Sequence, residues 1–199
     1  MATKNVNYYT LDIMGLLSRL FGREAEQPSK PRHGDGDMVS LVVLSASCPE
    51  LALESVRSTL DELFPGEFLP PREEGNFVID GSVPQAQFMV QCVVPNNGGV
   101  FMVQNVPSPY TEFSNFLSHI SDPTLHQLAA AQSCWLSVDL MHQYEPKVED
   151  AYRFIGALLA KLAPSDAAVL VHPSRMDAVR FTEHTRRQLA AGDHPFGMV

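Results

Sequence analysis

The chain has 199 residues, of which 45% are hydrophobic, and its 23 acidic and 14 basic side chains give a formal net charge of −9. This length and composition are typical of one globular domain that buries a core without stabilising metals or cross-links. Residues 39–150 hold 14 acidic and only 3 basic side chains. Such a segment repels a polyphosphate backbone, which excludes nucleic acid as the main partner.

Cysteine use and hydropathy predict a cytoplasmic protein. Cys48, Cys92 and Cys134 are widely spaced, lie in apolar segments and form no CxxC pair, so we expect three reduced core thiols. No apolar run reaches the roughly 18 residues of a membrane span, and no basic stretch precedes an apolar one at the N-terminus. Stable membrane insertion and export are therefore not expected.

The N-terminal 38 residues differ from the rest. Residues 1–22 contain "LDIMGLLSRLFGR", whose apolar residues fall on one stripe and predict a short amphipathic helix. This helix either packs back on the core or docks on a partner or a membrane surface. Residues 23–38, with two prolines and two glycines, predict a flexible linker. Translation from either Met1 or Met14 fits this pattern.

Residues 39–199 predict a single α+β domain. "MVSLVVLSAS" is apolar on both faces, as in a strand covered from both sides. Pro49 suits the first turn of a helix over "CPELALESVRSTLDELF". "FVIDG", the alternating "QAQFMVQCVV" and, after "PNNGG", "VFMVQNV" indicate a three-stranded antiparallel meander.

The second half of the domain alternates helices and strands. Ser108 and Asp122, each followed by a proline, are good N-caps for the helices "PYTEFSNFLSHI" and "TLHQLAAAQ". The strand "SCWLSVDLMH", the helix "KVEDAYRFIGALLAKLA" and the doubly apolar strand "AAVLVH" follow. Ser174 and Asp177 resemble a capping box that opens a final helix, which Gly192 would close.

This order predicts one mixed or antiparallel sheet of about six strands with helices mainly on one face. The two doubly apolar strands are expected at the centre of the sheet. If no helix covers the second face there, a homodimer is the simplest cover for it.

No established catalytic or cofactor motif is found. The chain lacks GxGxxG, GxxxxGK[ST], GxSxG, HExxH and paired CxxC patterns, so we predict no cofactor, no metal and no assigned catalytic residue. Four histidines have no partner at metal-ligand spacing: His119, His126, His184 and His194. The arginines of the last predicted helix are more typical of a solvated face than of a docking site. They are Arg175, Arg180, Arg186 and Arg187.

Two predicted strands end on a histidine, at His142 and at His172. If these strands are parallel neighbours joined by the helix over 147–163, both imidazoles lie at the same carboxyl edge, where open α/β sheets commonly bind ligands. Asp139 and Arg175 could complete a site for a metal or an anion. The alternative is that the histidines only cap strand ends and that Asp139 solvates an exposed strand.

Several segments together resemble an uncharacterised bacterial domain family of unknown function. They are "VSLVVLSAS" before an acidic helix, "QNVPSPYTE", "SCWLSVDL" and "EDAYRFIGALLAKLAPSDAAVLVHPS", over about residues 39–175. The tail "GLLSRLFGR" is similar to those of many small bacterial cytosolic proteins. The chain departs from the family at "AAAQSCW". The resemblance implies a stand-alone or accessory domain that binds another protein, and it carries over no catalytic residue.

The first functional hypothesis is therefore a non-enzymatic, cytoplasmic interaction domain, either homodimeric or an accessory or immunity-type partner. An acidic domain of this size associates rapidly with basic proteins. The alternative is a small hydrolase or a ligand- or metal-binding enzyme, with its site at the carboxyl ends of strands 134–142 and 167–172.

Overall fold

The computed structural model describes most of the compact unit Met38–Val199. The described residues are 39–48, 50–66, 77–79, 83–91, 98–110, 120–144 and 148–196, with backbone alone at 77–79, 83–91, 98 and 141–144. The predicted amphipathic helix, the linker, Cys92 and most of the helix predicted to follow Ser108 lie outside them. No helix in these ranges is long and apolar enough to cross a membrane.

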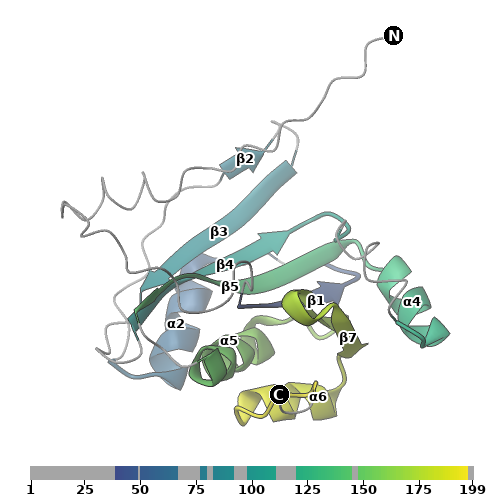
Figure 1. Ribbon diagram of the computed structural model, residues 1–199. Helices are drawn as coiled ribbons and strands as arrows, with labels where there is room; N and C mark the ends of the chain where they lie inside the picture. The colour runs from purple at the N-terminus through teal and green to yellow at the C-terminus, as the bar shows by residue number, and fades with distance from the viewer. Residues whose placement is uncertain are drawn as a thin grey trace. The chain divides into compact units, whose positions relative to one another are not determined.

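The fold is built on one antiparallel sheet, which confirms the α+β class (Figure 1). The strand order is β2-β3-β4-β5-β1-β6-β7. The strands are β1 (Ser40–Ser45), β2 (Phe77–Ile79), β3 (Val83–Gln91), β4 (Gly98–Val106), β5 (Cys134–Tyr144), β6 (Ala167–His172) and β7 (Asp177–Arg180). The sequence predicts about six strands. The sheet has five strands of at least six residues each, and the short strands β2 and β7 lie at its two edges.

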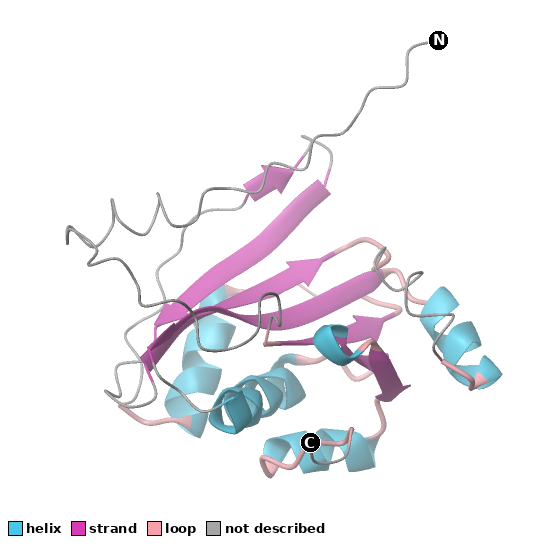
Figure 2. Ribbon diagram, viewed as in Figure 1, coloured by secondary structure: helices cyan, strands magenta, loops and turns pink. Residues whose placement is uncertain are grey.

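Helices cover both faces of this sheet, but unequally (Figure 2). They are α2 (Leu53–Leu63), α4 (Pro123–Ala130), α5 (Val148–Leu162) and α6 (Glu183–Ala190), with a short 3-10 turn, η1 (Pro173–Arg175). The main core joins the sheet to α2 and α5, and α6 packs on α5 through Leu189. A second, smaller core joins α4 to the opposite face. A homodimer is predicted only if no helix covers the second face of the sheet, and α4 packs on that face.

Strand β1 has the most enclosed position. It pairs with β5 on one side and β6 on the other, antiparallel to both. Leu41 and Val43 belong to the main core, whereas Val42 and Leu44 belong to the core under α4. The prediction of a strand covered on both faces is thus confirmed. Strands β5 and β6 consequently run in the same direction, but β1 separates them, so they are not the neighbours that the predicted site required.

The segment after β6 differs from its prediction. Ser174 and Asp177 do not open a helix, because Pro173–Arg175 forms η1 and Asp177–Arg180 forms β7 against β6. Helix α6 begins later, with the hydroxyl of Thr182 accepting from the Thr185 backbone N–H at 3.2 Å. Pairing with β6 therefore overrides the local capping pattern. Gly192, at φ 81°, follows the helix end as predicted.

The edge formed by β7 has backbone groups that are bound within the chain. The Ala178 N–H donates to Asp177 Oδ1 at 2.8 Å, and the Arg180 carbonyl accepts from Thr185 Oγ1 at 2.9 Å. A short, charged edge strand with two of its backbone groups already bonded within the chain is a poor template for another strand. We therefore do not expect a second copy to add to the sheet at this edge.

Cys48 and Cys134 form a disulfide, so the prediction of reduced thiols was wrong for this pair. The register of β1 and β5 places Ser45 opposite Cys134. The residues just after β1 therefore lie beside the start of β5, and the two Cα atoms are 5.3 Å apart despite a sequence separation of 86. Spacing along the chain gave no sign of this proximity.

Arg186 joins α6 to the end of α5 and is not part of a solvated arginine face. Its guanidinium donates to the carbonyls of Ala160 at 2.6 Å, Ala163 at 2.9 Å and Pro164 at 2.8 Å. Ala160 lies in the last turn of α5, where carbonyls lack a donor within the helix, and Ala163 and Pro164 directly follow the helix. Arg175 and Arg180 lie outside the final helix altogether, in η1 and β7.

We expect Arg186→Ala to lower the free energy of unfolding by about 3 kcal/mol, because charged hydrogen bonds to buried carbonyls are lost. Arg186→Lys should recover only part of this, since an ammonium cannot reproduce the guanidinium fork. The control is Arg187→Ala, at an exposed residue of the same helix, which should change stability by no more than about 0.5 kcal/mol. Urea denaturation measures all three, and equal losses at the two positions would contradict the assignment.

Candidate functional site

The candidate site lies where β6 ends. His172, the last residue of β6, is only 3% exposed and caps η1 through its side chain. Its Nδ1 accepts from the Arg175 backbone N–H at 3.4 Å. An imidazole whose Nδ1 accepts a hydrogen bond carries its proton on Nε2 when neutral. The histidine therefore fixes the turn that follows the strand.

Three other rings surround this imidazole. Tyr152 of α5 lies 4.7 Å from His172 between ring centroids, and His194 and Phe196, which follow α6, each lie at 5.3 Å. We call these four residues the histidine cluster. No sequence pattern indicates a partner for His194, because the contact depends on how the chain returns after α6. Tyr152 belongs to the helix predicted over "KVEDAYRFIGALLAKLA", and nothing in that pattern indicates its contact with His172.

The surroundings keep both histidines uncharged. Burial, together with nearby His194 and Arg175, lowers the pKa of His172 to about 4. Burial and Arg175 also lower the pKa of His194. In the described part of the chain, His194 Nδ1 is buried without a hydrogen-bond partner. At neutral pH the cluster therefore contains two neutral imidazoles.

A chain of polar contacts links the cluster to the surface. The Tyr152 hydroxyl lies 3.2 Å from Ser174 Oγ, which lies 3.4 Å from His172 Nδ1. A serine beside a histidine is the arrangement of a nucleophile and its general base. However, an imidazole with a pKa near 4 is a weak proton acceptor at neutral pH. The geometry therefore supports positioning of the turn better than it supports hydrolysis.

Of the four predicted site residues, the structure brings together His172 and Arg175. Asp139 lies elsewhere. Its neighbour Val138 belongs to the main core with α5, and side chains alternate along a strand, so the carboxylate of Asp139 faces away from α5. Since His172 contacts Tyr152 of α5, the carboxylate and the imidazole lie on opposite faces of the sheet.

Asp139 instead forms a buried polar group within the sheet, at 4% exposure. The Ser40 hydroxyl donates to its Oδ1. The Ser137 hydroxyl donates to Oδ2 at 2.6 Å, and the Gln104 amide donates to the same oxygen at 3.0 Å. Asp139 therefore does not solvate an exposed strand, as the alternative interpretation had it.

The side chain of His142 lies outside the described residues, but the backbone register places its strand position. Val42 of β1 pairs with Ser137 on one side and Val171 on the other. His142 lies five residues after Ser137 along β5, whereas His172 lies one residue after Val171 along β6. A difference of four residues corresponds to about 13 Å along the strands, in addition to about 10 Å across β1. The backbone does not bring these two histidines to one point.

No metal centre is seen in the residues that the structure describes, because no three His, Cys, Asp or Glu side chains there are close enough to hold an ion. A stable zinc site needs three or four such ligands. Two histidines beside Arg175 do not supply them.

Comparison with protein-family models, with curated proteins and with solved structures found no match to this chain. The resemblance to an uncharacterised bacterial family therefore stays a prediction. A fold by itself does not imply a function, so the function has to be argued from the site.

The lowered pKa of His172 predicts a loss of stability in acid. In the unfolded chain a histidine takes up its proton near pH 6.5, whereas the folded protein binds it only near pH 4. Since the unfolded state binds more protons between these values, the free energy of unfolding should fall as the pH is lowered from about 6.5 to about 4. Urea denaturation at a series of pH values measures this fall.

Two variants assign the effect. His172→Gln should make the fall between pH 6.5 and 4 clearly smaller, although it also lowers stability at neutral pH. His184→Gln, at an exposed residue of α6, should leave the fall unchanged. If His172→Gln has the same pH dependence as the unmodified chain, His172 is not the group responsible.

Asp139→Ala is expected to lower the free energy of unfolding by about 2 to 4 kcal/mol, because the buried hydroxyls of Ser40 and Ser137 lose their acceptor. Asp139→Asn keeps one carbonyl oxygen and should lose less. Thermal and urea unfolding test both variants, and a neutral effect of Asp139→Ala would show that the polar group is not stabilising.

Proposed function

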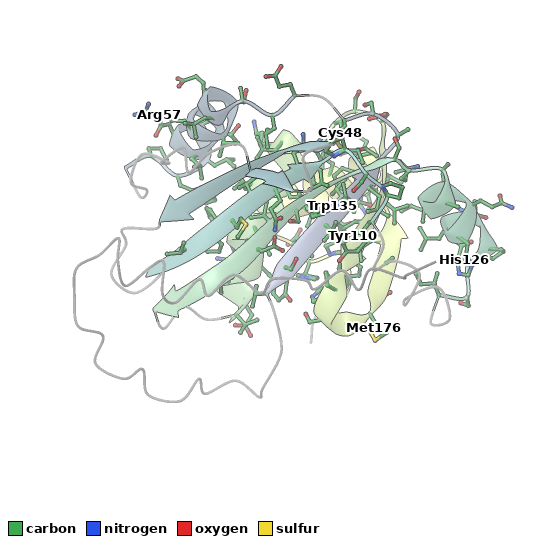
Figure 3. All side chains as sticks on the ribbon, turned by 90° about the horizontal axis from the view of Figure 1, so that it is seen from above. Cys48, Arg57, Tyr110, His126, Trp135 and Met176 are labelled. Carbon is green, nitrogen blue, oxygen red and sulfur yellow. A yellow bond between two sulfur atoms is a disulfide. The ribbon has the colours of Figure 1, made fainter. Side chains whose placement is uncertain are left out.

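We propose that the domain acts by binding another protein, without catalysis, through the turn of residues 173–176, here called the β6–β7 turn. The observation that carries this proposal is the exposure of Met176. The residue is 41% exposed, beside the exposed Ser174 and Arg175. In Figure 3 it lies at the periphery of the domain.

The backbone holds Met176 in a fixed, uncommon conformation. Its φ of 50° is in the left-handed region, which residues with a side chain rarely adopt. Its N–H donates to the Pro173 carbonyl at 3.0 Å, and the pairing of His172 with Asp177 closes the turn. Such a conformation persists only where the surrounding structure holds it. A partner therefore meets a preorganised surface and little ordering is needed on binding.

The chemistry of the turn suits a protein interface. Methionine and arginine are both enriched in interfaces relative to the rest of the surface, and a thioether adapts to irregular apolar pockets. Arg175 adds an exposed positive charge beside the thioether, which attracts an acidic residue at the rim of such a pocket. We therefore expect the partner to present an apolar pocket with an acidic residue at its rim.

Three observations favour a partner other than a second copy and a function other than hydrolysis. Helix α4 packs on the second sheet face, and two backbone groups of the β7 edge are bonded within the chain. His172 is a weak base at neutral pH. An accessory or immunity-type role in the cytoplasm is part of this proposal. The acidic excess of residues 39–150 lies outside the turn, whose own charged residue is the basic Arg175.

Site-specific photo-crosslinking in cells of the source organism tests the proposal. A photoreactive residue at position 176 should yield a discrete cross-linked protein, which mass spectrometry identifies. The same residue at position 187, exposed on α6, is the matched control and should not yield this product. Adding Arg175→Glu should reduce the product from position 176 at least fivefold, because the guanidinium contact becomes repulsive.

Equal products from both positions, or none above background at position 176, would overturn the proposal. A cross-link from position 176 to another copy of the chain would support the homodimer instead and contradict a heterologous partner. Circular dichroism of each variant excludes unfolding as the cause of a loss.

A further inference from the structure

The Cys48–Cys134 disulfide lies far from the β6–β7 turn. Cys48 follows the carboxyl end of β1, and Cys134 begins β5. Because β1 and β6 are antiparallel, the carboxyl end of β1 and the carboxyl end of β6 lie at opposite ends of the sheet. Figure 3 shows Cys48 and Met176 on opposite sides of the domain. Reduction of the disulfide therefore takes place away from the residues that form the β6–β7 turn.

We propose that Cys48 and Cys134 form a reversible thiol–disulfide pair, reduced by dithiols through attack at the Cys48 sulfur, while the domain stays folded in both states. A thiolate of the dithiol bonds to Cys48 Sγ, and Cys134 leaves as a thiolate that takes up a proton. The second thiol of the dithiol then displaces Cys48, which is also protonated. Two electrons pass to the pair, and the dithiol becomes a disulfide.

Unequal access to the two sulfurs supports this direction of attack. Cys134 is only 1% exposed, whereas Cys48 is half-buried. Exchange requires that a thiolate reach the sulfur that it attacks. Cys48 is therefore the sulfur open to a reductant, and Cys134 is the buried sulfur that re-forms the bond.

The reduced state has a hydrogen-bond acceptor in place. Asn105 Oδ1, on β4, lies 3.6 Å from the sulfur of Cys48 and 3.6 Å from that of Cys134. A thiol is a weak donor, and this oxygen lies within reach of either one. A buried thiol and a half-buried thiol next to an amide oxygen are better accommodated than two thiols in a purely apolar site.

Contacts other than the disulfide hold the segment after β1. The Ser47 N–H donates to Asp166 Oδ2 at 2.8 Å, and the Ser133 hydroxyl donates to the Ala46 carbonyl at 2.8 Å. The Ser133 N–H also donates to the Ser45 carbonyl at 3.1 Å. Breaking the S–S bond therefore leaves the two cysteines side by side, so the disulfide can form again.

The test uses the full chain in buffers with stepped ratios of reduced to oxidised dithiothreitol. After an acid quench, alkylation and peptide mass spectrometry give the oxidised fraction of the pair, while circular dichroism reports folding. We expect one transition with native circular dichroism throughout. Native-state alkylation after reduction should modify Cys48 at least tenfold faster than Cys134.

Asn105→Ala should shift the midpoint at least threefold, toward a higher ratio of dithiol to disulfide, because the thiols lose their acceptor. Gln104→Ala, the adjacent amide residue of β4, is the matched control and should leave the midpoint unchanged. Reduction only with loss of native structure, equal alkylation rates, or no disulfide in oxidising buffer would overturn the proposal. These three readouts come from the unmodified chain and do not depend on how the variants fold.

Discussion

The burial of β1 on both faces is the constraint on which the rest of the structure depends. Leu41 and Val43 face one core while Val42 and Leu44 face another, so the strand needs a cover on each side and a partner strand at each edge. Helices α2 and α5 provide the first cover and α4 the second. Pairing with both β5 and β6 gives these two strands the same direction. Because β1 and β6 are antiparallel, the disulfide beside the end of β1 and the histidine cluster at the end of β6 lie at opposite ends of the sheet.

Features that depend on neighbours in sequence could be predicted, and features that depend on distant pairing could not. The apolar pattern of β1, the N-cap at Asp122 and the stop at Gly192 are local signals, and each has its expected place. The four residues of β7 are too few to show an alternating pattern, and they form a strand only because β6 lies beside them. The disulfide likewise depends on the register of two strands.

The candidate site shows the same division. His172 could be selected because it ends a doubly apolar strand, but nothing near it in sequence indicates His194, which reaches it only through the packing of α6 on α5. Asp139 was selected because it is close to His142 along the chain. The alternation of β5 already contained the evidence against it, since a residue one step from Val138 points to the opposite face.

The neutral state of the histidine cluster explains how a buried polar group can support an exposed turn. A charged imidazole in this position would lose its hydration and would lie near His194 and Arg175, and these effects lower the pKa of His172. A neutral imidazole keeps a hydrogen-bond acceptor at Nδ1 for the backbone of the turn and presents an aromatic face to Tyr152 and Phe196. The cluster thus combines the packing of a core with one directed hydrogen bond. That combination gives the backbone N–H of Arg175, next to the left-handed residue Met176, an acceptor that an apolar side chain at position 172 could not supply.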